Sequence, residues 1–386
     1  MKKNLKKLTI IFIILIGSFS KANSLEDKIK IGMLVPMTGD NKQIGQSIIK
    51  AVRLAVLDID THKLEIYPKD TNSNPEQALK SAKELKEMGI NIVIGPVFFN
   101  SLIYLNEIDN ITFLSLTNKT IDIPDNVITS GVNALSQIVA IKKFIENNEM
   151  KKTIFLTPKS DYDQEIKKAI KKSKIKISKH YIYDTEPTKL TKQIEKITNY
   201  KVRKQNVLDE IKRIENSDMS DDEKERKIKK WKKRYTLGKL NFDSVIISDF
   251  DESLKSVVTS LLYTDVLPKN NFIITFNQWF DQSLLAEKNI QPIYYPSINK
   301  KNLEIFEKKF QNKFNEKPNH LALLSYDLVG LVYYLSIKND STEISKLFKK
   351  KNSFKGKIGI FEIQDNKINH RLNFYQIEDG KFKEIF

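Results

Sequence analysis

The chain has 386 residues, a formal charge of +17 and no cysteine. Without cysteine there is no disulfide scaffold, no thiol nucleophile and no cysteine-bound metal. A chain of this length exceeds what one hydrophobic core normally serves, which predicts two domains. We expect no metal and no cofactor, because the histidines show no metal-ligand spacing; they are His62, His180, His320 and His370.

The first 22 residues have the pattern of a secretory signal peptide. Four lysines among the first seven residues precede an apolar run at 8–17, and Ser20-Lys21-Ala22 is a small-x-small cleavage site. The run is shorter than the roughly 20 apolar residues that span a bilayer, although an uncleaved membrane anchor is the alternative. We therefore expect cleavage after Ala22, a periplasmic location, no membrane span in the mature chain and, for want of a cysteine, no lipid anchor.

The positive charge does not by itself point to nucleic acid. Removing the five lysines of the first 22 residues leaves a charge of +12. The remaining lysines are spread along the chain without interleaved aromatic residues, and export removes the usual partner, so we expect no nucleic-acid binding. Attraction to an anionic membrane surface or cell-wall polymer stays open.

After the signal, short apolar runs alternate with longer amphipathic stretches. The runs predict strands at 29–35, 64–67, 90–94, 111–116, 153–156, 175–183, 242–248, 272–275 and 293–295. Helices are expected at 46–59, from Asn74-Pro75 to Gly89, and at 134–147, 163–172 and 320–337, before a β-rich tail at 354–386. This alternation predicts an α/β protein with two successive parallel sheets, whose strands are covered on both faces. Ligands of such sheets bind where the strands end, in the crease between two lobes.

The stretch 201–235 breaks this rhythm. It holds 13 Lys/Arg and 8 Asp/Glu but no glycine or proline. Apolar residues recur at helical spacing in two groups, and Ser220 with Glu223 fits a capping box between them. The pattern predicts a helical hairpin inserted in the second lobe. It is either a solvated decoration or a docking surface for a partner protein, with Trp231 and Tyr235 as exposed anchors.

Four segments in order resemble the type I periplasmic binding proteins of the Leu/Ile/Val-binding class. They are IGMLVPMTGDNKQIGQSI, INIVIGPVFFNSL, HLALLSYDLVGLVYYL and SFKGKIGIFEIQDNK. The resemblance implies two Rossmann-like lobes joined by three hinge crossings. Lobe one would comprise 27–131 and 296–345, and lobe two 132–295, with the insertion, and 346–386.

Within that family the chain resembles most the branch of penicillin-binding-protein activators. The segments NYKVRKQNVLDEI, NFDSVIISD and FNQWFDQSL carry this resemblance. Activators of this kind keep the binding-protein fold and act on cell-wall synthases. The resemblance thus implies a non-enzymatic protein, which agrees with the lack of a Ser/His/Asp order, a paired-carboxylate loop or a phosphate loop.

The chain departs from the amino-acid receptors of the family at three ligand positions. Phe98 and Phe99 stand where small hydroxyl residues hold the ligand carboxylate, and Tyr162 is followed by Asp163 instead of glycine. No carboxylate follows the strand ending at Thr275, where one would pair with a ligand ammonium. These departures weigh against a plain zwitterionic amino acid.

The candidate ligand contacts come from loops at the strand ends. They are Thr38, Asn100, Ser101, Thr117 and Asn118 in lobe one, with Tyr162, Gln278 and Trp279 in lobe two. A helix opening at Asn100-Ser101 suits an anion, and the two aromatic side chains offer flat contact area with a polar handle. This set favours a polar ring, a sugar or a peptide fragment.

Two functions remain open. The first is a receptor that binds a small polar solute, an amino acid or a related compound, for an inner-membrane ABC permease. The second is an adaptor that regulates peptidoglycan synthesis through a penicillin-binding protein.

Overall fold

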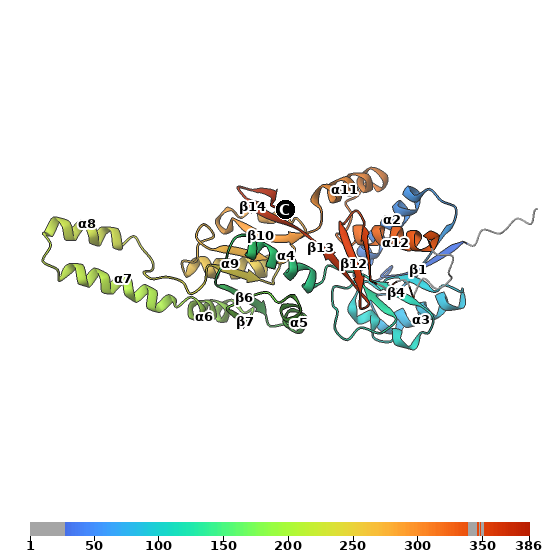
Figure 1. Cartoon of the computed structure of the whole chain (residues 1–386), viewed down its shortest axis with the longest axis horizontal. Helices are drawn as coiled ribbons and strands as arrows, with labels where there is room; N and C mark the ends of the chain where they lie inside the picture. The colour runs from blue at the N-terminus through green and yellow to red at the C-terminus, as the bar shows by residue number, and fades with distance from the viewer. Residues whose placement is uncertain (1–27, 339–345, 347, 349–350) are drawn as a thin grey trace, which may run out of the picture.

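The computed structural model describes residues 28–338, 346, 348 and 351–386, and the expected signal peptide, 1–22, lies outside them. These residues form two α/β lobes side by side, with a helical hairpin projecting from the second (Figure 1). Among them, no helix is both long enough and apolar enough to cross a membrane. The α/β class and the two-lobe architecture expected from the sequence are confirmed.

Lobe one contains an eight-stranded sheet in the order β11-β12-β13-β5-β4-β3-β1-β2. Its strands are β1 (Ile29–Val35), β2 (Leu64–Asp70), β3 (Ile92–Ile94), β4 (Thr112–Ser115), β5 (Val127–Thr129), β11 (Asn352–Lys355), β12 (Ile360–Gln364) and β13 (Lys367–Arg371). The first five are parallel, with Ile31 opposite Ile66 and Met33 opposite Ile94. β1 is apolar throughout because both of its faces are covered: Met33 packs in the core that holds α2, and Leu34 in the core that holds α3.

The helices of lobe one cover both faces of this sheet. They are α2 (Lys42–Ile59), α3 (Pro75–Glu87) and α12 (Ala322–Lys338), and α2 and α12 pack against each other. Asn74 caps α3 as expected, since its side chain accepts from the backbone of Gln77 at 2.9 Å, and Pro75 occupies the first turn.

Lobe two contains a seven-stranded sheet in the order β15-β14-β10-β9-β8-β6-β7. Its strands are β6 (Thr153–Pro158), β7 (Lys179–Tyr183), β8 (Ser244–Ile247), β9 (Phe272–Thr275), β10 (Ile293–Ser297), β14 (Asn373–Glu378) and β15 (Lys381–Glu384). Its helices include α4 (Ala134–Asn147), α5 (Asp163–Ser173), α6 (Pro187–Ile197), α9 (Asp251–Tyr263) and α10 (Ser283–Ala286). After β10 the chain enters α11 (Lys300–Phe314), which contacts α2 of lobe one.

The expected third crossing at 345 is wrong. The segment 352–371 forms β11–β13, which extend the sheet of lobe one, and only β14 and β15 join lobe two. The chain crosses at Leu372, between β13 and β14. β13 stays in lobe one because it runs parallel to β5, where Thr129 donates its backbone N–H to the carbonyl of Asn366 at 3.1 Å.

The crossings are tied together by hydrogen bonds at the hinge. The Asn133 amide donates to the carbonyl of Ile368 at 3.0 Å. The backbone N–H of His370 donates to the Ser136 hydroxyl at 2.9 Å, and its ring nitrogen Nε2 lies 2.7 Å from the carbonyl of Ser130. The first and third crossings are therefore joined by direct hydrogen bonds.

The hairpin consists of α7 (Tyr200–Glu215) and α8 (Asp221–Trp231), as the sequence predicts. Ser220 stands at the N-cap of α8, but its side chain makes no capping hydrogen bond, so that half of the expected capping box is absent. Buried Arg203 fastens the base of the hairpin: its guanidinium donates to the carbonyl of Thr264 at 3.1 Å and to the Thr236 hydroxyl at 2.7 Å.

Candidate functional site

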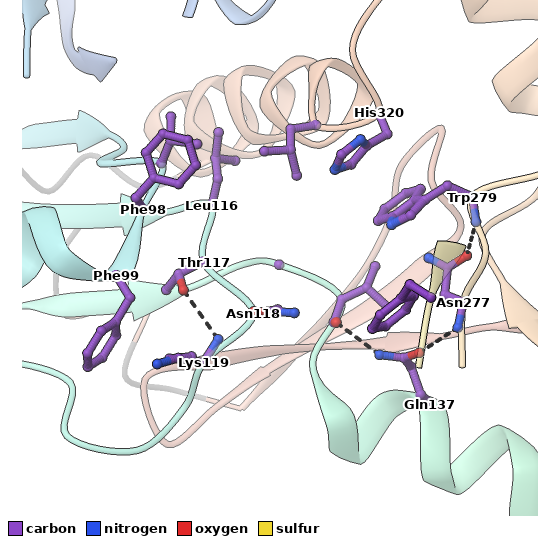
Figure 2. Close-up of a pocket in the computed structure, with 15 residues that line it drawn as sticks. Phe98, Phe99, Leu116, Thr117, Asn118, Lys119, Gln137, Asn277, Trp279 and His320 are labelled. Atoms are coloured by element: carbon purple, nitrogen blue, oxygen red, sulfur yellow. Dashed lines mark hydrogen bonds between the residues drawn. The ribbon is translucent and has the colours of Figure 1, made fainter. Parts of the chain in front are cut away.

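A cavity of about 310 Å³ lies between the lobes, where the loops at the carboxyl ends of the strands meet (Figure 2). Lobe one and the hinge contribute Val97, Phe98, Phe99, Leu116, Thr117, Asn118, Lys119, Gly131, Val132, His320 and Leu321; lobe two contributes Gln137, Phe250, Asn277 and Trp279. A ligand held here contacts both lobes.

Aromatic side chains form much of the wall. Phe98 and Phe99 come from the loop after β3, Phe250 from the loop after β8 and Trp279 from the loop after β9. The Trp279 ring lies against the His320 ring, with centroids 4.9 Å apart and planes at 34° (Figure 2). Because His320 precedes α12 of lobe one, this contact joins the two lobes. Burial lowers the pKa of His320, so the ring is neutral at physiological pH.

The charged side chains of the described lining are of one sign only. Lys119 is the one lysine or arginine among the described lining residues, and none of them is an aspartate or glutamate. Its ammonium lies 4.5 Å from the centre of the Phe99 ring. The described lining therefore favours an anion and offers an ammonium group no carboxylate.

Hydrogen bonds hold the polar lining residues Gln137 and Asn277 in place. The Gln137 side-chain oxygen accepts from the backbone N–H of Asn277 at 2.7 Å. The Asn277 side-chain oxygen accepts from the backbone of Trp279 at 2.9 Å and from the Ser297 hydroxyl at 2.8 Å. These hydrogen bonds fix the orientation of the Asn277 side-chain amide, whose Nδ2 group is buried without a hydrogen-bond partner. A buried donor without a partner is costly, so a ligand acceptor that hydrogen-bonds to Asn277 Nδ2 would remove this cost.

Three of the residues singled out from the sequence line the cavity: Thr117, Asn118 and Trp279. The loop geometry after β9 explains why Gln278 does not. Trp279 and Phe280 both have positive φ, at 47° and 57°. This tight turn aims Asn277 at the cavity and buries Gln278, whose amide donates to the carbonyls of Asp249 and Phe276, both at 3.0 Å.

The other candidates lie outside the cavity lining. Thr38 is exposed and donates to Asp70 at 2.5 Å. Asn100 is exposed and Ser101 is buried in η1 (Phe99–Leu102), a four-residue 3-10 turn, so the expected regular helix start for an anion does not form there. Tyr162 packs against the core, and its hydroxyl is buried without a partner.

Sequence reasoning missed Lys119, Gln137, Phe250, Asn277 and His320. Asn277 had a usable signal, since an asparagine directly after a strand favours a turn stabilised by its own side chain. His320 had none, because its contact with Trp279 joins residues of different lobes.

A second contact between the lobes lies beside the hinge. The carboxylate of Glu165, buried on α5, accepts from the backbone N–H groups of Thr120 and Ile121 at 2.5 and 2.7 Å and from the Thr120 hydroxyl at 2.7 Å. The loop of Thr120 belongs to lobe one. We call this group the Glu165 clasp; hydrogen bonds to a charged acceptor are among the stronger ones in proteins.

Comparison with known proteins agrees with this geometry. A sequence model described as periplasmic binding protein matches residues 28–202. No curated protein sequence matches the chain.

Several solved structures have the same fold. The branched-chain amino acid transporter substrate-binding protein LivJ of Streptococcus pneumoniae, in complex with isoleucine, has a TM-score of 0.57 at 18% identity, over 92% of this chain and 98% of that one. The C-domain of LpoA from Haemophilus influenzae, a regulator of PBP1A, has a TM-score of 0.61 at 15% identity, over 92% and 100%. An ABC transporter solute-binding protein of R. palustris, in complex with benzoate, has a TM-score of 0.54 at 15% identity, over 93% and 95%. The chain is thus a protein of the type I periplasmic-binding-protein fold, and residues 28–202 match the sequence model of that family.

Proposed function

We propose that this protein binds a small organic anion with an apolar or aromatic body in the cleft between its lobes, and that it serves as a solute-binding protein for a membrane permease after export to the periplasm. One observation carries the proposal: the described residues that line the cavity from both lobes supply aromatic walls, a lysine, no acid and an unpartnered buried donor. The role is binding and not catalysis.

The lining selects among solutes by charge. A ligand carboxylate finds a cation in Lys119 and a hydrogen-bond donor in Asn277 Nδ2. The ammonium of a free amino acid finds no carboxylate among the described lining residues, and burying a charge without an ionic partner is costly. The benzoate complex of the R. palustris protein shows that an aromatic carboxylate is a ligand for a protein of this fold.

Closure of the lobes would signal the bound state. A ligand that contacts both lobes stabilises the closed arrangement by its differential affinity for that arrangement. The Trp279–His320 contact and the Glu165 clasp also join the two lobes, so they would add to the stability of the closed arrangement.

A thermal-unfolding screen of residues 23–386 tests this function, with benzoate, phenylacetate, branched 2-oxo acids, leucine and a dipeptide as probes. A carboxylate at about 100 times its Kd stabilises the fold by about 2.7 kcal/mol, which is a rise of a few degrees in Tm. Asn277→Ala should abolish the rise, and the matched control Asn100→Ala, an exposed residue outside the cavity, should leave it unchanged. A rise with leucine and none with any simple carboxylate would show that the charge argument is wrong.

The hairpin favours a second function, that of an adaptor for peptidoglycan synthesis. It projects from lobe two on the side away from lobe one (Figure 1), and the similarly folded LpoA C-domain belongs to a regulator of PBP1A. The measurement is binding to a purified penicillin-binding protein, with 201–235 replaced by a short loop. If that replacement abolishes binding while Asn277→Ala does not, the adaptor function replaces the solute receptor.

A further inference from the structure

The hairpin separates its charges along its length. The turn and the start of α8 hold six acids and one lysine; the acids are Glu215, Asp218, Asp221, Asp222, Glu223 and Glu225. The next nine residues hold seven cations and no acid; the cations are Arg226, Lys227, Lys229, Lys230, Lys232, Lys233 and Arg234. We call residues 226–234 the basic segment.

All seven cations are exposed, and none forms a salt bridge with any residue in the described part of the chain. Acids in the first turn of α8 and lysines in its last turn also suit the helix dipole. The dipole favours cations near the helix end at Trp231 but does not require seven of them, and Lys232, Lys233 and Arg234 follow that end. The segment therefore carries more unpaired positive charge than the helix requires.

One side of the helical part of the basic segment packs on α7, and the rest faces outward. Ile228 and Trp231, one helical turn apart, are half-buried, and α8 packs against α7. No residue of α8 is fully buried, so its cations are exposed on the sides of the helix that do not face α7. Such an array suits a plane of mobile anionic groups, which rearrange to meet each cation, better than a rigid ligand of fixed shape.

Two aromatic side chains accompany the cations. The Arg234 guanidinium lies 4.8 Å from the centre of the Trp231 ring, and Tyr235 is 76% exposed. Tryptophan and tyrosine beside lysine and arginine are the residues that settle at the headgroup level of a bilayer. The buried Arg203 at the base of the hairpin holds this surface in a fixed direction relative to lobe two.

We propose that the basic segment docks the protein on a bilayer surface of anionic phospholipid. Clusters of four to eight Lys/Arg on a helix are typical of such binding. The acidic turn is repelled by the same surface, so the C-terminal end of α8 lies nearest the headgroups. This site is separate from the interlobe cleft and does not depend on the proposed solute.

Vesicle sedimentation of residues 23–386 tests the proposal; omitting the first 22 residues removes their own lysines and apolar run. We expect binding to vesicles of phosphatidylcholine with about 40% phosphatidylglycerol, none to phosphatidylcholine alone, and release in 0.5 M NaCl, because salt screens exposed charges. Lys229, Lys230, Lys232 and Lys233→Gln together should lower the partition coefficient by about a hundredfold or more, since each lysine near the surface contributes about fivefold.

The matched control replaces four exposed lysines of helices elsewhere, Lys83, Lys86, Lys301 and Lys308→Gln, and should retain most of the binding. A Trp279→Phe variant leaves Trp231 as the one tryptophan, so its fluorescence should shift to the blue on anionic vesicles.

Equal binding to neutral vesicles, or an equal loss in both quadruple variants, overturns the proposal. It is also overturned if an acidic polypeptide such as polyglutamate binds the basic segment while anionic vesicles do not, because the partner is then a protein.

Discussion

The Glu165 clasp should set how far the lobes open without ligand. Glu165→Ala removes a buried carboxylate together with the three hydrogen bonds that it accepts. The donors are the Thr120 N–H, the Thr120 hydroxyl and the Ile121 N–H, at 2.5, 2.7 and 2.7 Å. Hydrogen bonds to charged groups contribute about 1.5–3 kcal/mol each, but water satisfies the Thr120 and Ile121 donors once the lobes part. We therefore expect the closed arrangement to lose about 2–4 kcal/mol relative to the open one.

The loss is measurable in two ways. The radius of gyration from small-angle scattering should rise in Glu165→Ala, because the open form becomes the major one. The affinity for a cleft ligand should fall in proportion to the closed fraction, about tenfold for each 1.4 kcal/mol. Thr120→Val removes the hydroxyl bond alone and should produce a smaller change of the same kind. Unchanged scattering and affinity in Glu165→Ala would refute the reasoning.

Three further predictions concern stability. Burial lowers the pKa of His370 to about 4, so the free energy of unfolding should fall by about 3 kcal/mol as pH drops from 6.5 to 4, where only the unfolded chain takes up the proton; His370→Gln should remove this slope in denaturant titrations, and an unchanged slope would show that His370 is not its source. Burial raises the pKa of Asp327 to about 6 despite two backbone donors, so its contribution has the opposite sign and stability from this group falls as pH rises through 4 to 6; Asp327→Asn should make the loss at low pH steeper, and a shallower loss would contradict the sign. Arg203→Ala leaves Thr236 and the carbonyl of Thr264 without their donor and should expose the hairpin to limited proteolysis, whereas exposed Arg213→Ala should change little; equal protease resistance in the two variants would argue against Arg203 as the anchor.

Local patterns in the sequence predicted the parts of the fold that local physics determines. The cap at Asn74, the apolar strand 29–35 and the hairpin of 201–235 all follow from propensity, periodicity and charge, and the structure has them. Local patterns do not predict which of the two sheets the segment 352–371 joins. Its short strands alternate in burial and pair antiparallel with one another, and such strands fit the edge of either sheet.

The site was harder to predict because it depends on side-chain direction and on contacts between distant residues. Asn277 lines the cavity, whereas its neighbour Gln278 points away from it and hydrogen-bonds to the backbone. The positive φ angles of the following turn produce this difference between adjacent residues. The Glu165 clasp joins residues 44 and 45 positions apart, from different lobes. The strand-end loops could be anticipated from the sheet order, but the particular side chains they aim inward could not.

Titration of the cleft through the fluorescence of Trp279 shows whether the protein binds a small organic anion between its lobes. In a Trp231→Phe variant Trp279 is the one tryptophan left, and it lines the cavity against His320. We expect an aromatic carboxylate such as benzoate to change its fluorescence saturably, leucine to leave it unchanged, and Asn277→Ala to abolish the change. A saturable change with leucine and none with carboxylates, or the same titration in Asn277→Ala, would contradict this expectation.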